Sequence, residues 1–349
     1  MRRMLTVLAL LGTLALLVAA MLVWAWWGTA RPVSAEETAP VLVRVEQGAA
    51  LQTIATDLRA QSLIPSVFWF TVLGRVQGVV AKPGTYSLRA SQAPSELLSM
   101  LADGEVAENS VTIPEGWRAE EIADRLVQEE VVTDRATFGA AVSSVAAYPA
   151  LVARLQLAGT EYVDGFLFPD TYRFALDSSA TEVVGRFVAN FLRRTDGLTL
   201  TYDTVILASI VEREARFDED RPLIAGVYQN RIDAGMSLDA DPTVQYAKAN
   251  QANAACLLVA TGTRSSCGAV QWWPTITVAD YQGVDSPFST YRNTGLPPRP
   301  IANPGLASLQ AAAAPAEHEY LYFLSDSSGR THFARTLAEH AANKRQYLR

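Results

Sequence analysis

The sequence predicts an α+β fold with an N-terminal transmembrane helix, a small subdomain and a larger mixed domain. Three observations support this prediction. An uncharged run at residues 4–27 is long enough to cross the core of a bilayer as a helix. Helical and strand patterns are interspersed along residues 41–349 without a regular strand–helix–strand period, which favours α+β over a parallel α/β fold. A strand–glycine–helix pattern also occurs twice, at 43–58 and at 111–126.

The composition is that of a globular protein and excludes two classes of chain. Of the 349 residues, 49 % are hydrophobic and 19 % are charged, which is too apolar for a disordered protein. The net charge is −7 and no cluster of Lys and Arg supplies a basic face, so we expect no nucleic-acid partner. The length suffices for one large domain or two ordinary ones.

The N-terminal apolar run predicts a membrane anchor at 1–28. Arg2 and Arg3 precede the run and the tryptophan-rich residues 24–27 end it, which suits a helix with its N-terminus in the cytoplasm. A cleaved signal peptide is the alternative, because residues 33–35 (VSA) resemble a cleavage site, although the apolar part of a signal peptide is usually only about 7–15 residues long. In both cases the rest of the chain is extracytoplasmic, and we predict a single-pass protein of the cell membrane.

The next segment predicts a small subdomain at 41–105, joined to the anchor by a polar, Pro-containing tether at 29–40. It begins with an alternating strand pattern and a glycine turn, followed by helical periodicity over 49–64. A turn then leads into a second strand at 82–88, and another helix follows at 94–101. This succession is similar to small glycan-binding modules of the LysM type. A generic strand–helix unit is the alternative.

The rest of the chain predicts the larger mixed domain, at 106–349. It is mostly helical as far as about residue 200, apart from an aromatic loop at 164–172 that carries two carboxylates. A segment rich in Pro and Gly occupies 287–305. The other elements predicted are helices at 204–217, 221–233 and 304–314, a strand at 320–325 and a final helix from Thr336.

The two cysteines, Cys256 and Cys267, do not have the spacing of a metal site, and the three His lie far from them in sequence. We therefore expect no zinc site, and the sequence gives no sign of a cofactor. In an oxidising compartment a disulfide can close this short loop. Two free, partly buried thiols are the alternative.

One acidic residue stands out in the helical segment at 204–217. Glu214 falls on the same helical face as Leu207, Ile210 and Val211, where a carboxylate is costly to bury. Such a residue is either neutralised structurally or lines a cleft in which desolvation raises its pKa and keeps a proton available. Periodicity alone does not decide between these roles.

Several segments resemble one known family in the same order. They are residues 111–118, 164–172, 207–247 and 286–312, and the stretch from YLYFLSD to residue 340. Together they resemble the endolytic murein transglycosylase family, also called YceG-like, over nearly all of the chain outside the anchor. Long motifs in the correct order are far more specific than any single motif. The resemblance implies that Glu214, the second Glu of the V-E-x-E run, is the catalytic acid and that 41–105 is a LysM-like subdomain.

The resemblance also implies the substrate and the reaction. The substrate would be the glycan strands of peptidoglycan, cut between N-acetylmuramic acid and N-acetylglucosamine. Glu214 would protonate the leaving oxygen and then remove a proton from the 6-hydroxyl of the sugar, which closes a 1,6-anhydro ring. Cell-wall synthases are implied as partners. The residues that we expect to orient the glycan or hold Glu214 are Asn230, Arg231, Asp241, Thr243, Gln245 and Tyr246.

Two other functions stay open. A hydrolytic muramidase would use Glu214 with a second carboxylate, such as Asp239 or Asp241. A non-catalytic scaffold would only bind glycan. Residues 248–285 form a longer segment than the shorter family members have at this place, and we expect Trp272 and Trp273 to extend the cleft wall there.

Overall fold

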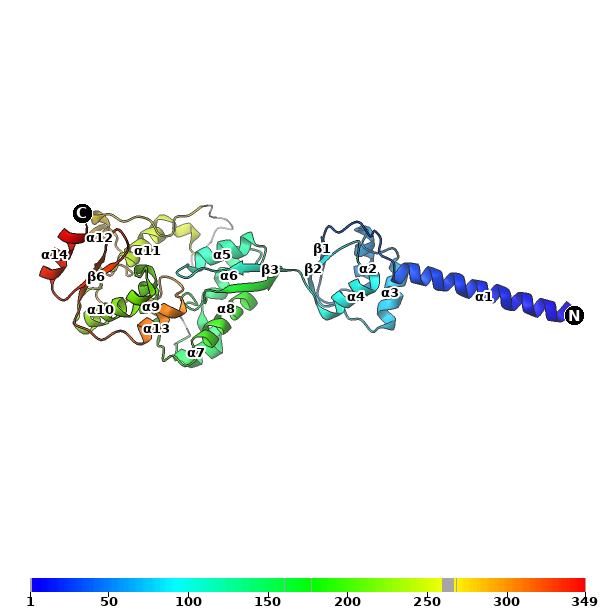
Figure 1. The fold of residues 1–349 in the computed structure, drawn as a ribbon, viewed down its shortest axis with the longest axis horizontal. Helices are drawn as coiled ribbons and strands as arrows, with labels where there is room; N and C mark the ends of the chain where they lie inside the picture. The colour runs from blue at the N-terminus through cyan, green and yellow to red at the C-terminus, as the bar shows by residue number, and fades with distance from the viewer. Residues whose placement is uncertain (1, 160, 177, 259–266, 268, 349) are drawn as a thin grey trace. The chain divides into compact units, whose positions relative to one another are not determined.

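The computed structural model describes residues 2–159, 161–176, 178–258, 267 and 269–348. The chain divides into two compact units (Figure 1). The first comprises Met1–Asn109 with Ala175–Asp177, and the second comprises Ser110–Phe174 with Ser178–Arg349. Both units mix helices with two-stranded sheets, which confirms the predicted α+β class.

The first unit is a strand–helix–helix–strand–helix module preceded by a long apolar helix. Strands β1 and β2 pair antiparallel, with Val43 opposite Tyr86. Val43 and Val45 point into the core while their neighbours face outward, the alternation that a half-buried strand requires. The elements are α1 (Arg2–Thr29), β1 (Val41–Val45), α2 (Leu51–Ala60), α3 (Val67–Val76), β2 (Gly84–Leu88) and α4 (Pro94–Asp103).

Helix α1 contains a 20-residue stretch, Leu10–Thr29, that is long and apolar enough to cross a membrane. The most apolar part of this stretch has a mean hydropathy of 2.0, and none of its residues is buried within the protein. A signal sequence has the same properties, so the helix is consistent with both interpretations of the N-terminus.

The second unit surrounds a buried central helix, α9. Strand β3 pairs with β4, and β5 pairs antiparallel with β6 so that Phe323 lies opposite Phe333. The elements up to α9 are β3 (Glu108–Thr112), α5 (Ala119–Gln128), α6 (Arg135–Val142), α7 (Pro149–Leu155), β4 (Thr171–Ala175), α8 (Ala180–Arg194) and α9 (Tyr202–Glu214). Those that follow are α10 (Arg221–Asp233), α11 (Asp241–Ala252), α12 (Val278–Gly283), α13 (Leu306–Ala313), β5 (Tyr322–Ser325), β6 (Thr331–Ala334) and α14 (Leu337–Tyr347), with short 3₁₀ turns between some of them.

The repeat seen in the sequence is also a repeat of local structure. Both ends of α5 lie 68 positions after the corresponding ends of α2. Gly48 and Gly116 precede these helices at matching positions and have φ angles of 76° and 74°, a left-handed conformation that favours glycine. After α2 come α3, β2 and α4, whereas α5 is followed by two helices, α6 and α7, before β4 and α8, so the repeat does not extend beyond the first helix in the same element order.

The helix predicted at 204–217 differs from the observed one. Helix α9 ends at Glu214, because the backbone turns to an extended conformation at Ala215. Phe217, which the predicted helix included, lies outside the observed helix and is 40 % exposed. The residues from Val205 to Val211 are all buried, so the helix is covered on every side there and its apolar residues do not form a single stripe.

The two cysteines form a disulfide between Cys256 and Cys267, with their Cα atoms 5.8 Å apart. We expect the oxidised chain to be lighter than the reduced chain by two hydrogen atoms and to resist alkylation until a reductant is added. Mass spectrometry of the non-reduced protein checks this. Labelling of both thiols without a reductant would contradict it.

Candidate active site

The candidate active site is centred on Glu214, the last residue of α9. The seven residues from Val205 to Val211 hold the helix in the core, so its C-terminal end is fixed in position. The hydroxyl of Tyr228, on α10, donates a hydrogen bond of 3.0 Å to the Glu214 carboxylate. Tyr228 is itself 1 % exposed, so it presents a rigid donor to a partly buried acid.

The surroundings of Glu214 favour its protonated form. Burial raises its pKa from 4.5 to about 7, and the carboxylate of Asp241 acts in the same direction. The Tyr228 hydrogen bond and the charge of Arg231 oppose this shift. The C-terminal end of a helix carries partial negative charge, which also disfavours a carboxylate there. Near neutral pH this group can therefore both give and take a proton.

A second carboxylate and two tyrosines accompany Glu214. Asp241 is the first residue of α11, where the helix dipole favours a negative charge, and it accepts a hydrogen bond of 2.7 Å from the Tyr291 hydroxyl. The ring of Tyr291 stacks on that of Tyr281, with centroids 4.3 Å apart. Burial and then Asp241 raise the pKa of Tyr281, so this phenol stays neutral at physiological pH. In the sequence, residues 287–305 stood out only as rich in Pro and Gly, and no pattern singled out Tyr228 or Tyr281.

Asn230 and Arg231, two of the expected glycan-binding residues, are occupied by backbone contacts. The amide of Asn230 donates to the carbonyl oxygens of His318 and Tyr320, at 2.8 and 3.0 Å. Arg231 donates to the carbonyl oxygens of Leu321, Ser237 and Leu238 and pairs with Asp239 at 3.1 Å. Both side chains thus fasten the segment before β5 to α10, while the charge of Arg231 also acts on Glu214.

The three expected residues on α11 hold neighbouring loops. Thr243 is fully buried and shares a hydrogen bond of 2.9 Å with Thr290. Gln245 donates to the carbonyl oxygen of Pro274 at 3.1 Å. The ring of Tyr246 is buried, and the Arg118 guanidinium lies 4.0 Å from its centroid. Of the six expected residues, Asp241 and Arg231 are the two whose charges act on Glu214.

Glu212 serves the packing of α9. Its carboxylate pairs with Arg221 at 3.3 Å and accepts a hydrogen bond of 2.9 Å from the backbone N–H of Gly305. Its side chain is 6 % exposed. The two acids of this helix end therefore differ in surroundings, since Glu212 is neutralised by an arginine and Glu214 is held by a phenol.

Asn303 joins three of the segments that resemble the family. Its side chain is fully buried, accepts hydrogen bonds from the backbone N–H groups of Gly165 and Leu167, and donates to the Trp117 carbonyl and to Asp164. Motifs far apart in the sequence thus meet at one amide. No pattern in the sequence singled out this residue.

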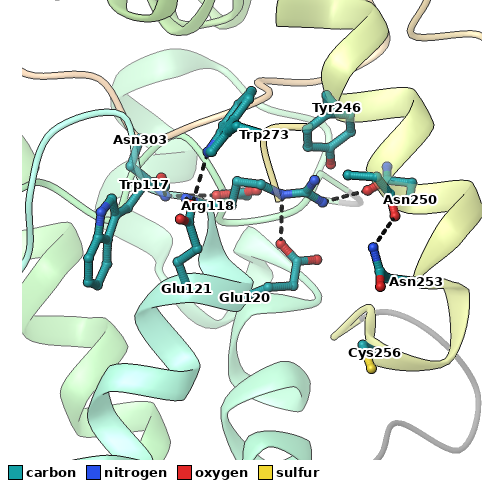
Figure 2. Close-up of polar contacts among 12 residues, drawn as sticks. Trp117, Arg118, Glu120, Glu121, Tyr246, Asn250, Asn253, Cys256, Trp273 and Asn303 are labelled. Atoms are coloured by element: carbon teal, nitrogen blue, oxygen red, sulfur yellow. Dashed lines mark hydrogen bonds and ion pairs between the residues drawn. The ribbon is translucent and has the colours of Figure 1, made fainter. Parts of the chain in front are cut away.

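Arg118 forms the centre of a second buried polar cluster (Figure 2). Its side chain is inaccessible to solvent, pairs with Glu120 at 3.2 Å and donates to Asn250 at 2.5 Å. Trp272 is 4 % exposed, and the Arg118 guanidinium lies 4.6 Å from the centroid of its ring. The expectation that Trp272 extends an open cleft wall was therefore wrong, because the segment packs inward onto a buried charge.

Trp273 connects the same segment to the helix that carries Glu214. Its indole N–H donates to Glu121 at 3.2 Å (Figure 2), and the Arg213 guanidinium lies 3.9 Å from its ring centroid. A cation over an indole face contributes about 0.5–2 kcal/mol. Since Arg213 precedes Glu214, this contact helps to fix the end of α9.

Two substitutions should move the pH dependence of activity in opposite directions. Asp241→Asn removes a charge that raises the pKa of Glu214, so the fall of activity at high pH should begin about one pH unit lower or less. Tyr228→Phe removes a hydrogen bond that lowers this pKa, so the fall should begin at higher pH. Profiles of kcat/KM against pH on purified glycan strands measure both. Shifts in the same direction would contradict the assignment of these two contacts.

Comparison with known proteins gives one consistent result. The sequence model of the YceG-like family matches residues 43–346. Relatives named endolytic murein transglycosylase occur in Streptococcus pneumoniae R6, 27 % identical over 91 % of this chain and 60 % of the relative, and in Bacillus subtilis 168, 27 % identical over 91 % and 87 %. The chain thus spans about 60 % of the length of the streptococcal relative.

A solved structure agrees with the sequence comparison. A crystal structure of a YceG-like protein from Listeria monocytogenes is 27 % identical and covers 87 % of this chain and 98 % of its own, with a TM-score of 0.52. The match therefore extends over most of both chains in sequence and in fold. Because the family pattern also spans residues 43–346, this chain belongs to the YceG-like family.

Proposed function

We propose that this protein is an endolytic lytic transglycosylase of peptidoglycan and that Glu214 is its catalytic acid and base. The observation that carries the proposal is a carboxyl group with a pKa near 7, fixed at the end of a buried helix in the segment that resembles the family's catalytic motif. The names of the curated relatives support the same reaction. An acid whose pKa lies near neutrality suits proton transfer in both directions.

The reaction needs one such group and no water. Glu214 protonates the oxygen that links N-acetylmuramic acid to the next N-acetylglucosamine, and the bond from that oxygen to C1 breaks. The resulting carboxylate takes the proton of the muramic acid 6-hydroxyl, whose oxygen bonds to C1. Glu214 is then protonated again, and the strand ends in a 1,6-anhydro sugar. Because the nucleophile belongs to the same sugar, it is already positioned for attack.

Asp241 and Arg231 tune this acid, in our proposal, and the remaining expected residues position the loops around it. The negative charge of Asp241 keeps a proton on Glu214 at the start of the reaction. Tyr281 and Tyr291 offer half-buried phenols next to these carboxylates, and we assign them to contact with the glycan. Asn230, Thr243, Gln245 and Tyr246 act through the backbone and ring contacts described above.

A hydrolytic muramidase is the second candidate, because Asp241 lies close enough to Glu214 to raise its pKa. An inverting hydrolase places its two carboxyl groups about 6.5–9.5 Å apart to admit a water molecule, and a retaining one about 5–5.5 Å apart. Digestion of purified glycan strands in ¹⁸O-labelled water separates the two reactions. We expect unlabelled 1,6-anhydro ends, and labelled reducing ends would establish hydrolysis.

The compartment and the partners are part of the proposal. We infer that α1 anchors the protein in the cytoplasmic membrane and that both units act outside it, where peptidoglycan lies. We further infer that the module at 41–105 is a LysM-like glycan-binding subdomain, which its strand–helix–helix–strand order supports. Cell-wall synthases are the expected protein partners, since a strand-cutting enzyme acts where strands are made.

An uncleaved anchor makes a specific prediction. The mature protein should retain its first residues and stay with membranes after a wash at high salt, because burial of an apolar helix of this length does not depend on ionic strength. Protease added to intact spheroplasts should digest the rest of the chain. N-terminal sequencing that finds Glu36 as the first residue would show a cleaved signal peptide instead.

A further inference from the structure

A cavity of about 380 Å³ lies apart from the Glu214 cluster and has the size of a small-ligand site. Aromatic rings and one cation form most of its wall, and Glu214 is not among the lining residues. The lining residues are Glu161, Tyr162, Tyr202, Phe288, Pro298 and Arg299. This cavity plays no part in the mechanism described above.

Arg299 is the cation of this wall, which also contains the acid Glu161, and its hydrogen-bonding capacity is largely unused. In the described part of the chain its one hydrogen bond is a long contact of 3.4 Å from Nη2 to the Tyr246 hydroxyl. Its Nε is buried without a partner. The guanidinium lies 4.4 Å from the Tyr162 ring centroid and 5.5 Å from that of Phe288, so the two rings hold it in place. A rigid guanidinium with free N–H donors suits a carboxylate.

The charges of the buried acids Asp164 and Glu120 act on Arg299, so a ligand carboxylate would bind a guanidinium that these acids partly neutralise without forming hydrogen bonds to it. Asp164 and Glu120 do not line this cavity but a separate, smaller space that Arg299 also borders. Glu120 is paired with Arg118 at 3.2 Å, and Asp164 accepts a hydrogen bond from Asn303. Glu161 does line the cavity, but its carboxylate oxygens accept hydrogen bonds of 2.9 and 2.8 Å from the backbone N–H groups of Ala158 and Gly159.

The rings of the wall favour a short peptide over a neutral sugar. A sugar needs an open aromatic face, whereas the Tyr162 ring already lies against the Arg299 guanidinium. Tyr202 stacks on Phe166 with centroids 6.1 Å apart, and Phe288 leans on Tyr246 at 4.7 Å. These rings therefore present apolar walls suited to methyl and methylene groups. An apolar wall with one guanidinium matches a small peptide that ends in a carboxylate.

We propose that this cavity binds the carboxylate-bearing peptide branch of the glycan strand, with the carboxylate on Arg299. The inference rests on the proposed function, because it assigns the branch to the same substrate. One loop connects the two places, since Phe288 lines the cavity and Tyr291, three positions further, bonds to Asp241 beside Glu214. The branch on Arg299 would thus help to choose which sugar is placed at Glu214.

The test is a binding series on the full chain in detergent, carrying Glu214→Gln so that no ligand is cut. Calorimetry compares three ligands: a disaccharide with its tripeptide, the same compound with every peptide carboxylate amidated, and the peptide-free disaccharide. We expect the free carboxylates to improve affinity at least about tenfold over the amidated ligand. Arg299→Gln should remove this difference, and Arg299→Lys should retain part of it.

Equal affinity for the free and amidated ligands would overturn the proposal, and so would an Arg299→Gln variant that still discriminates between them. Tighter binding of the peptide-free disaccharide would establish a sugar site in its place. If Arg299→Gln does not fold, the ligand series on the chain that retains Arg299 still decides. If the wild-type products are 1,6-anhydro sugars but the free carboxylates do not improve affinity, only this inference is wrong. If the products are those of hydrolysis but the free carboxylates do improve affinity, only the proposed reaction is wrong.

Discussion

Glu214→Gln should lower the rate of glycan cleavage by about 10²–10⁴-fold, the usual contribution of a general acid and base. The amide keeps the shape of the side chain and can still accept the hydrogen bond from Tyr228, but it cannot give up a proton as an acid. Release of 1,6-anhydro fragments, followed by mass spectrometry, measures the effect. Full activity in this variant would overturn the assignment of the site.

Two controls separate chemistry from structure. Glu219→Gln alters an exposed acid five positions away and should leave the rate unchanged. Glu212→Gln should reduce stability more than chemistry, because Glu212 pairs with Arg221 and accepts from Gly305. An equal loss of rate in all three variants would show that the assay reports unfolding.

Glu214→Gln should also change the stability of the protein, by an amount that depends on pH. The pKa of Glu214 is about 7 in the folded state against 4.5 for the ordinary group, so the folded state holds the proton more tightly. The stability that this proton confers is complete below about pH 4.5 and is lost as pH rises through about 7. Glu214→Gln should therefore be more stable than the unsubstituted chain at pH 8, by up to about 3 kcal/mol, and similar to it at acid pH. Denaturant titration at both pH values checks this.

Arg118→Met is expected to be the most destabilising of the substitutions considered, with a loss of about 3–5 kcal/mol. The change leaves the carboxylate of Glu120, 4 % exposed, without its partner (Figure 2). It also removes the cation that packs on the rings of Tyr246 and Trp272. The free energy of unfolding in urea measures the loss.

A control on the same helix sharpens this prediction. Arg125 forms an i,i+4 pair with Glu129 at 3.6 Å, and both side chains are at least one-third exposed. Arg125→Ala should change stability by only about 0.5 kcal/mol. Replacing Glu120 by Leu together with Arg118→Met should recover part of the loss, because it removes the unpaired charge. Equal stability of the Arg118→Met and Arg125→Ala variants would show that the buried pair contributes no more than the exposed one.

Much of the fold could be predicted because it depends on local patterns. The alternation of VLVRV located the strand at 41–45, and helical spacing located α10 at its observed bounds of Arg221–Asp233. The repeat at an offset of 68 anticipated both the helices and their preceding glycine turns. Strands β4 and β6 were missed, because each is only four or five residues long and follows a loop. So short a run contains too few alternations to distinguish it from the loop beside it.

The candidate site was likewise only partly predictable from the sequence. The acid itself was singled out from the sequence as a candidate, by its match to a family motif and by a helical spacing that left a structural role open. Asp241 and Arg231 were named from the motif, but the tyrosines near Glu214 were not, because Tyr228 lies 14 positions away and Tyr281 and Tyr291 come from a later segment. Asn230 and Arg231 were expected to orient the glycan or to hold Glu214. They stand in the motif, but their donors hold the segment before β5.

The sequence by itself determined the apolar N-terminal run and the elements of the first unit other than α3, and it singled out Glu214 as the candidate acid. These follow from hydrophobic periodicity and from motif strings that a single stretch of chain contains. Only the tertiary structure decided that Glu214 holds a proton near neutral pH, that Arg118 reaches Asn250 across 132 positions and that Arg299 faces a cavity. The physical reason is that desolvation, charge interaction and hydrogen bonding depend on distance in space, and the groups responsible are distant in sequence.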